Sequence, residues 1–202
     1  NSLNDTVETL LNYTRYEEVN KTIVNYADFI NSTIEQFYVD NQSRIEETTI
    51  EYISSEIPSS ETISIKIDKM LFRQVFFNIF ANSIEALKDE KRVITIQTRK
   101  LPRQTTLDRY PDKLMLGIDE TIIETIITDN GPGIKQEHFE RIFAPFFTTK
   151  VEGNGLGLAV AWKIIKAHGG EIFVENVKNG QGAIFYLLIP TEINSLNMEQ
   201  IL

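Results

Sequence analysis

The chain has 202 residues, a formal net charge of −9 at pH 7 and no cysteine. The acidic balance argues against a nucleic-acid partner, because proteins that bind phosphate backbones usually present a basic face. The lack of cysteine excludes disulfides, Cys-based zinc sites and thiol nucleophiles, and no apolar run approaches the roughly 20 residues that cross a bilayer. We therefore expect a cytoplasmic fragment without membrane contact, built around one domain of about 150 residues.

The first third of the chain predicts helices and strands in alternation. Leu3, Val7 and Leu10 have the spacing of one helix face, and this pattern breaks through residues 15–22. Helical spacing returns from residue 23 to about residue 38. Residues 45–54 and 62–68 then indicate strands, the second because apolar and polar residues alternate. The first pattern is either the end of a helix from a preceding domain or an ordinary amphipathic helix that packs on this one.

A longer helix is predicted from Asp68, which suits an N-cap, to Leu87. Asn78 and Asn82 are four residues apart and project from the same face of this otherwise apolar helix. Neutral amides are costly to bury without partners, and their carbonyl oxygens suit a hard cation such as Mg²⁺. Taken alone, such a pair is more often structural than metal-binding. The motifs downstream favour the cation.

Two further strands are predicted at about residues 93–99 and 122–128. They are joined by the loop 100–120, which contains two prolines and mixed charge. We interpret this loop as a surface excursion with no assigned task.

Two glycine-rich segments follow these strands. In DNGPGI, the carboxylate of Asp129 can accept a bond from an exocyclic amine such as that of adenine, while Gly131 and Gly133 let the backbone approach a flat ring. In GNGLGL, glycines open a predicted amphipathic helix at residues 156–167. Unpaired N–H groups at a helix start form an anion site. One segment would select a base and the other would receive phosphates.

The order of these motifs resembles the catalytic, ATP-binding domain of sensor histidine kinases, within the superfamily that includes gyrase-type ATPases. The helix with Asn78 and Asn82 resembles the N box in its nitrogen-regulator-like form, and DNGPGI resembles the G1 box. FAPFF at residues 143–147 resembles the F box, and GNGLGL the G2 box. The resemblance covers roughly residues 62–191 and implies ATP and Mg²⁺ as cofactors.

The resemblance also implies a role for individual positions. Asn82 would be the principal Mg²⁺ ligand with Asn78 nearby, and Asp129 would bind the adenine amino group. Residues 135–152 would form a mobile ATP lid, in which Lys150 is the best candidate to neutralise phosphate. The implied nucleotide-binding residues are Asn78, Asn82, Asp129, Gly131, Gly133, Ile134, Phe143, Thr148, Thr149, Lys150, Gly153, Gly155, Leu156, Gly157 and Leu158.

The chain departs from the commonest family pattern beside the second asparagine. Many relatives carry Lys-Tyr or His-Tyr three and four residues after it, where these side chains touch phosphate and base. Here these positions are Glu85 and Ala86. The departure leaves open which cation besides Lys150 meets the phosphates, with Arg141 and Lys135 as candidates.

A histidine kinase phosphorylates a histidine on a two-helix dimerisation domain that precedes the ATP domain. The chain has two histidines, His138 in the predicted lid and His168 at a helix end, and neither has the neighbours of an acceptor. We interpret His168 as interacting favourably with the helix dipole and His138 as a solvated lid residue. The acceptor, the one residue we would call catalytic, is therefore expected upstream of this fragment.

We accordingly interpret residues 1–20 as the end of the second dimerisation helix with its linker, 21–191 as the catalytic domain and 192–202 as a C-terminal tail. The resemblance implies transfer of the ATP γ-phosphoryl group to the upstream histidine and then to an aspartate of a response regulator, in a homodimeric full-length protein whose membrane anchor, if any, lies upstream. A gyrase- or mismatch-repair-type ATPase is an alternative, but it would need a glutamate where Asn78 stands to activate water. A non-catalytic nucleotide-binding signalling module is the other alternative, against which the intact motifs argue.

The expected fold is a two-layer α/β sandwich. A mixed, mostly antiparallel sheet would be covered on one face by about three helices. The expected core aromatics are Phe76, Phe77, Phe80, Trp162, Phe173 and Phe185. Phe146 and Phe147 are ambiguous between packing and partner contact, with packing favoured.

Overall fold

The computed structural model describes residues 19–42, 45, 47–53, 63–86, 91–111, 121–150, 153–178 and 181–191. The expectations for residues 1–18, 151–152 and 192–202 lie outside this part of the chain. The elements in chain order are β1 (Thr22–Asn25), α2 (Tyr26–Asp40), β2 (Thr48–Ile53), β3 (Ser64–Ile67), α3 (Lys69–Ala86), β4 (Arg92–Leu101), α4 (Arg103–Arg109), β5 (Ile122–Asp129), the 3₁₀ turn η1 (Gln136–His138), α5 (Gly157–Ala167), β6 (Glu171–Asn176) and β7 (Ala183–Pro190).

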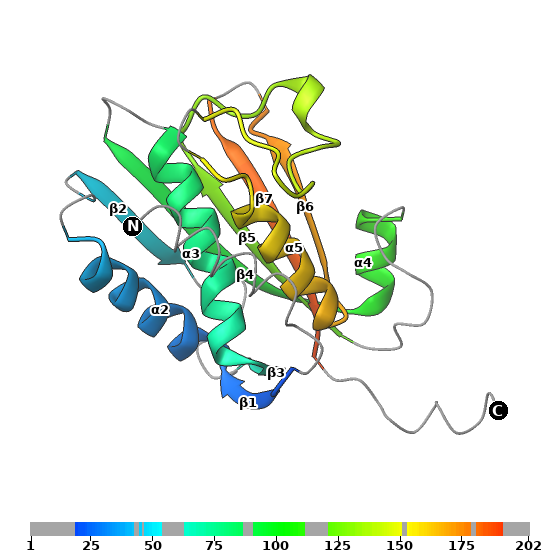
Figure 1. Cartoon of the computed structure of the whole chain (residues 1–202). Coiled ribbons are helices and arrows are strands. Elements are labelled where there is room, and N and C mark those ends of the chain that lie inside the picture. The colour runs from blue at the N-terminus through cyan, green and yellow to red at the C-terminus, as the bar shows by residue number, and fades with distance from the viewer. Residues whose placement is uncertain are drawn as a thin grey trace.

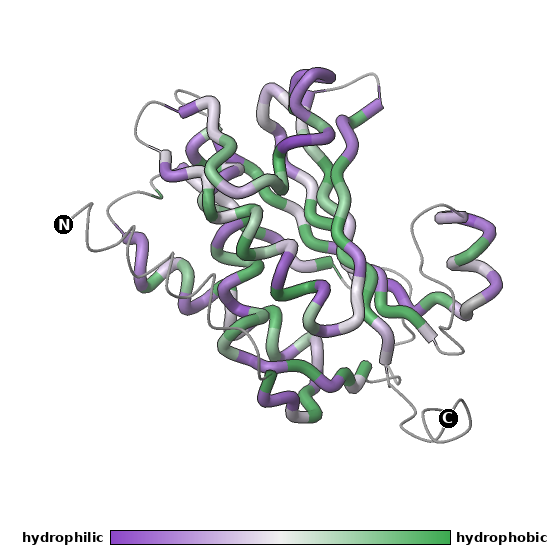
Figure 2. The backbone as a smooth tube through the Cα atoms, turned by 45° about the vertical axis from the view of Figure 1, so that its right-hand side comes forward, coloured by the Kyte–Doolittle hydropathy of each residue, from purple (hydrophilic) through white to green (hydrophobic). Residues whose placement is uncertain are grey.

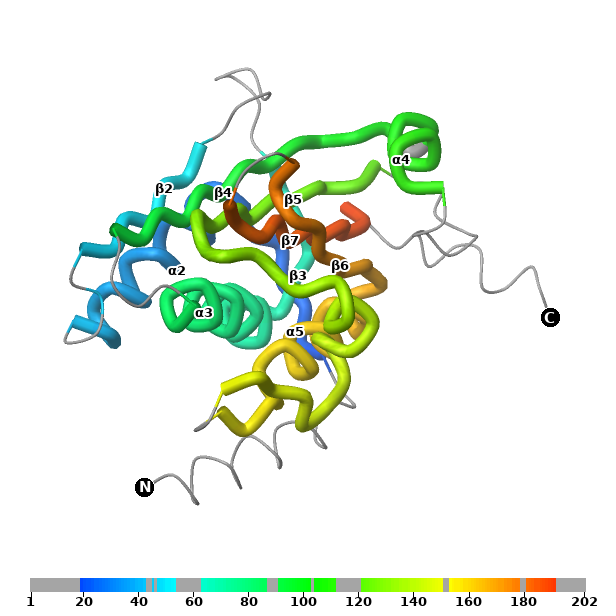
Figure 3. The backbone as a smooth tube through the Cα atoms, turned by 90° about the horizontal axis from the view of Figure 1, so that it is seen from above, coloured from blue at the N-terminus to red at the C-terminus, as the bar shows by residue number. Residues whose placement is uncertain are grey.

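Within the described residues, five strands form one sheet in the order β2-β4-β5-β7-β6. The β2–β4 pair is parallel and the other three pairs are antiparallel. Helices α2, α3 and α5 lie together on one face of this sheet (Figures 1 and 3). The predicted two-layer sandwich with a mixed, mostly antiparallel sheet is confirmed.

The core lies between this sheet and the three helices. Ile123 and Ile127 of β5 are completely buried in it, and the Tyr26 hydroxyl of α2 lies 2.8 Å from the Thr125 hydroxyl between them. Odd-numbered residues of β5 therefore face the helices, as the period of two along a strand requires. Asp129, at the end of β5, has the same parity and points to the same side. Figure 2 shows hydrophobic segments both in the strands and in the helices beside them.

The helix predicted from Ile23 begins three residues later than expected. Residues 22–25 instead form β1, which pairs antiparallel with β3 in a separate two-stranded sheet. The β-branched Thr-Ile-Val run favours extended backbone. Asn25 then starts α2, because its side-chain oxygen accepts bonds from the N–H groups of Ala27 and Asp28 at 3.1 and 3.3 Å.

The described part of the predicted loop 100–120, residues 100–111, is more than a surface excursion, which corrects the prediction for these residues. It contains α4, and the following residue, Tyr110, is only 9% exposed. Its ring packs edge-to-face on Phe173 and Tyr186, with centroids 5.3 and 6.0 Å away. These residues form a second hydrophobic cluster with Leu101, and α4 lies on the opposite side of the sheet from α2, α3 and α5 (Figure 3). The short helix α4 is therefore an addition to the three predicted helices that cover one face of the sheet.

Trp162 is 40% exposed, so its predicted place in the core is wrong. The buried side of α5 is formed by residues 160, 161, 164 and 165, and position 162 lies outside that face. The Lys166 ammonium lies 5.7 Å from the centre of its ring. The other expected core residues are buried or pack against the core: Phe76, Phe77, Phe80, Phe173 and Phe185.

No helix in the described part is long and apolar enough to span a bilayer.

Candidate functional site

One cavity brings most of the predicted site residues together. Its volume of about 920 Å³ is at the upper end of the range for small-molecule sites. It lies between α3, the start of α5, the end of β5, the start of β7, and residues of the segments 132–150 and 153–155. The predicted residues that line it are Asn78, Asn82, Asp129, Gly133, Ile134, Thr148, Thr149, Lys150, Gly153, Gly155, Gly157 and Leu158.

Three predicted residues do not line the cavity. Leu156 is completely buried, and Phe143 packs against the main core. Gly131 contacts Asp129, where a Cβ would come within 2.9 Å of the carboxylate oxygen Oδ1. Their contribution to a site is therefore to shape the segments that carry the lining residues.

Asp129 is held rigidly at the end of β5. It is 7% exposed, and its Oδ1 accepts bonds from the N–H groups of Gly131 and Ala183 at 2.9 and 3.1 Å. Its Oδ2 accepts a bond from the Ser83 hydroxyl at 3.0 Å. A carboxylate offers about four lone-pair sites, so Oδ2 retains one acceptor position on a fixed group. This geometry suits a ligand that donates a hydrogen bond, such as an exocyclic amine.

The glycine loop after Asp129 is clamped to the end of β6. Asn176 accepts a bond from the Ile134 N–H and donates one to the Ile134 carbonyl, both at 2.8 Å. Gly133 has φ +75°, and a Cβ there would lie 2.8 Å from the Asn176 oxygen. Only glycine adopts this conformation readily. Neither Asn176 nor Ser83 was predicted, because they lie 42 and 46 residues from their partners and carry no local signal.

The two asparagines of α3 differ in their contacts. The Asn82 side-chain nitrogen donates to the Asn78 carbonyl at 2.9 Å, which turns the Asn82 oxygen Oδ1 away from the helix. That oxygen accepts a bond from the Lys150 ammonium at 2.7 Å. The Asn78 side-chain nitrogen is buried and has no hydrogen-bond partner among the described residues. A positive group thus already lies on the oxygen that the sequence assigned to Mg²⁺, so the residues present fit a cation at this place.

Lys150 connects the segment after β5 to helix α3. Besides Asn82, its ammonium contacts the Glu85 carboxylate at 2.5 Å. Its backbone N–H donates to the Thr148 hydroxyl at 3.0 Å, which orders the turn before it. Of the other two candidate cations, Lys135 lines the cavity and Arg141 does not. The Arg141 guanidinium lies 4.8 Å from the centre of the Phe147 ring.

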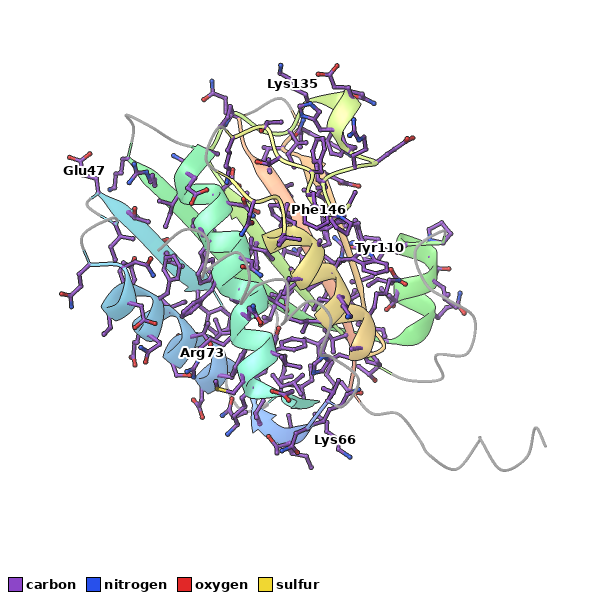
Figure 4. All side chains as sticks on the ribbon, in the orientation of Figure 1. Glu47, Lys66, Arg73, Tyr110, Lys135 and Phe146 are labelled. Carbon is purple, nitrogen blue, oxygen red and sulfur yellow. The ribbon has the colours of Figure 1, made fainter. Side chains whose placement is uncertain are left out.

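Aromatic residues within the segment 135–150 pack on one another and on the core. Phe147 packs against the core, and its ring meets that of His138 edge-to-face at 5.3 Å. His138 also lines the cavity, so it is not simply a solvated residue. Phe146 is 64% exposed and has φ +64°, so packing is confirmed for Phe147 only. Figure 4 shows Lys135 at the upper edge of the molecule and Phe146 lower, near the start of α5.

The start of α5 opens on the cavity. Gly157 is its first residue, and Gly157 and Leu158 both line the cavity wall. The N–H groups of a first helical turn lack intrahelical acceptors and attract anions. Gly155, with φ +66°, makes the turn that leads into the helix, and a Cβ there would lie 2.5 Å from the Phe146 carbonyl carbon.

His168 caps the other end of α5, as its position predicted, but it is a neutral residue. Its Nδ1 donates to the Ile164 carbonyl at 2.7 Å, and its Nε2 accepts a bond from the Asp68 N–H at 3.0 Å. Burial lowers the pKa of the imidazole because a charge is poorly solvated there. The interaction with the helix end is therefore a neutral hydrogen bond and not the attraction of a charged ring to the dipole.

Comparisons with known proteins agree with this arrangement. Residues 67–193 match the family of histidine kinase-, DNA gyrase B- and HSP90-like ATPases. Sensor histidine kinase ZraS of Salmonella typhi is 33% identical over 189 residues, which are 93% of this chain and 35% of ZraS. The histidine-protein kinase AtoS of Escherichia coli K12 is 32% identical over 189 residues, covering 94% of this chain and 27% of AtoS. The chain thus spans about a third of the length of these relatives.

Solved structures show the same architecture. The nucleotide-free catalytic domain of histidine kinase ThkA has a TM-score of 0.61 and 29% identity, and the match covers 85% of this chain and 96% of that domain. ThkA in complex with the response regulator TrrA has a TM-score of 0.65 and 27% identity, covering 94% of this chain and 47% of ThkA. The chain belongs to the family of histidine kinase-, DNA gyrase B- and HSP90-like ATPases, and its domain is the catalytic, ATP-binding domain of the sensor histidine kinase type.

Proposed function

We propose that this chain binds Mg²⁺-ATP in the cavity and supplies the γ-phosphoryl group to a histidine on a helical dimerisation domain, which passes it to an aspartate of a response regulator. The proposal rests on two groups that line the same cavity. One is the fixed carboxylate of Asp129, which retains an acceptor position, and the other is the amide oxygen of Asn82, which binds the Lys150 ammonium. The first suits the adenine amine, and the second suits the metal and the phosphates.

The roles follow from what each group can donate or accept. Asp129 would accept the bond from the adenine amino group, with Ser83 and Ala183 fixing its orientation. Asn82 would hold Mg²⁺, which would supply charge neutralisation at the phosphates when bound. Lys150 and the first turn of α5 would add positive charge around the phosphates. Phosphoryl transfer depends mostly on positioning and on charge neutralisation, so this set is chemically adequate.

The same geometry argues against water as the acceptor. Asn78 stands on α3 where a hydrolytic relative would need a carboxylate, and an amide cannot act as a general base. Neither histidine of the chain suits phosphorylation: His168 is 2% exposed with both ring nitrogens engaged, and His138 packs edge-to-face on Phe147. The acceptor is therefore assigned to another domain. The complex of the related ThkA with a response regulator supports the same partner class here.

The test is calorimetric titration of ADP and ATP in the presence of Mg²⁺. Wild-type protein is expected to bind both nucleotides, and Asp129→Asn to bind neither measurably, because the amide replaces an acceptor with a competing donor. Asp108→Asn, on the distant helix α4, is the matched control and should bind as wild type. No binding by folded wild-type protein would overturn the proposal. So would formation of acid-labile phosphate on this chain alone.

A further inference from the structure

Two side-chain oxygens of helix α3 converge on one positive charge. The Lys150 ammonium lies 2.7 Å from the Asn82 oxygen Oδ1 and 2.5 Å from the Glu85 oxygen Oε2. Residues three apart on a helix are neighbours on its surface, so both oxygens project from the same stripe of α3. Asn82 and Glu85 both line the cavity. They form a cation-binding pair of oxygens, which the ammonium occupies in this structure.

The pairing is not explained as a stabilising surface contact. The Glu85 side chain is 53% exposed and that of Lys150 is 35% exposed, and exposed ion pairs contribute little to stability because water competes for both charges. The ammonium is also shared with a neutral amide oxygen, although exposed carboxylates are available elsewhere on the surface. The position of Lys150 is better explained by the chemistry of the pair, which offers one negative charge and two hard oxygens.

We infer that Glu85 is a second protein ligand of the divalent cation, and that Lys150 occupies the cation's place until Mg²⁺-nucleotide arrives. The inference rests on the proposed function of the cavity, and it adds a metal ligand that the proposed function does not itself require. Mg²⁺ prefers oxygen ligands at 2.0–2.1 Å and is usually held by one or two carboxylates together with phosphates. Two oxygens that share one ammonium are close enough for the exposed Glu85 side chain to complete such a contact by a rotamer change.

Replacement of one cation by the other has a consequence for the phosphates. An ammonium and Mg²⁺ repel each other and compete for the same two oxygens, so the ion displaces Lys150. The freed ammonium is carried by the segment that lines the cavity together with Thr148 and Thr149, and it becomes available to a phosphate. Without the metal, Glu85 holds Lys150 back from the nucleotide. The metal requirement of nucleotide binding should therefore depend on Glu85.

The experiment measures the Kd of ADP by calorimetry in Mg²⁺ and in excess chelator, for wild type and for Glu85→Gln. The amide keeps the shape of the side chain and removes its charge. Glu85→Gln is expected to reduce the Mg²⁺-dependent gain in ADP affinity by about tenfold or more, since the loss of even an outer partner of a metal ligand costs about 10–100-fold. Metal-free ADP should bind as well as or better than to wild type, because Lys150 is released. Glu35→Gln, on the exposed side of α2, removes one charge elsewhere and should change neither Kd.

Two results would overturn the inference. If Glu85→Gln raises ADP affinity equally with and without Mg²⁺, the carboxylate only competes for Lys150. If it changes neither Kd, the contact is incidental. Failure of the proposed function looks different, since wild-type protein would then bind no ADP in either condition. In that case titration with Mn²⁺, followed by electron paramagnetic resonance, still decides: weaker Mn²⁺ binding by Glu85→Gln supports the ligand, and equal binding refutes it.

Discussion

Replacement of Tyr110 by Phe tests the cluster that α4 forms with the sheet. Glu124 is completely buried on β5, and its Oε1 accepts a short hydrogen bond from the Tyr110 hydroxyl. Arg99 and Arg109 each approach this carboxylate only to 3.7 Å, and Oε2 has no hydrogen-bond partner among the described residues. Burial, together with the bond to Glu124, raises the pKa of the Tyr110 phenol. The hydroxyl therefore remains a donor at every ordinary pH.

The expected loss follows from the charge of the acceptor. A hydrogen bond to a charged group contributes about 1.5–3 kcal/mol, and a neutral one about 0.5–1.5 kcal/mol. Phe keeps the ring contacts with Phe173 and Tyr186, so packing should change little. We expect Tyr110→Phe to lower the free energy of unfolding by about 2 kcal/mol, which corresponds to a fall of roughly 4–8 °C in Tm for a chain of this size. In a Glu124→Gln background the same change should cost only about 1 kcal/mol.

The assay is urea unfolding followed by circular dichroism, with Tm as a second measure. Nucleotide affinity is the internal control. It should be unchanged, because neither Tyr110 nor Glu124 lines the cavity. A loss below about 0.5 kcal/mol, smaller than the contribution of even a neutral hydrogen bond, would refute the reasoning. So would an equal loss in both backgrounds, since the charge of Glu124 would then play no part.

The remaining predictions concern the two ends of α5. Because burial lowers the pKa of His168 below its usual 6.5, the unfolded chain binds the proton more tightly; stability should be complete above about pH 6.5 and fall as the pH drops. His168→Gln should flatten the pH 5–7 dependence of unfolding, and an unchanged slope would show that another group titrates. Gly155→Ala should weaken ADP binding by tenfold or more, because its Cβ meets the Phe146 backbone at 2.5 Å beside the cavity and relief of about 1–3 kcal/mol of strain requires this segment to move. Gly170→Ala meets the Leu188 carbonyl at the same distance but away from the cavity, so it should lower Tm and leave ADP affinity intact; the opposite pattern would contradict this assignment.

The sequence alone determined those elements in which apolar and polar residues recur with a regular period. The period of two in β3 and the helical spacing in α3 and α5 are local records of which side faces the core, and the structure contains each of these elements. The sequence also predicted residues that the structure brings to one cavity, since Asp129 with its glycines and, in the context of the downstream motifs, the pair Asn78 and Asn82 indicate a nucleotide site. Their motifs are contiguous, so no tertiary information was needed to recognise them.

Only the tertiary structure decided which partner each group meets. β1 was predicted as part of a helix but pairs with β3, about 40 residues away. The spacing of apolar residues shows which side of a segment is buried, and it does not show which element packs there. The same holds for Tyr110, which reaches Glu124 across the turn from α4, and for Asn176, which clamps the loop at Ile134. The meeting of Lys150 with Asn82 and Glu85 spans 68 and 65 residues. Charge and hydrogen bonding act through space, so their partners emerge only when the chain has folded.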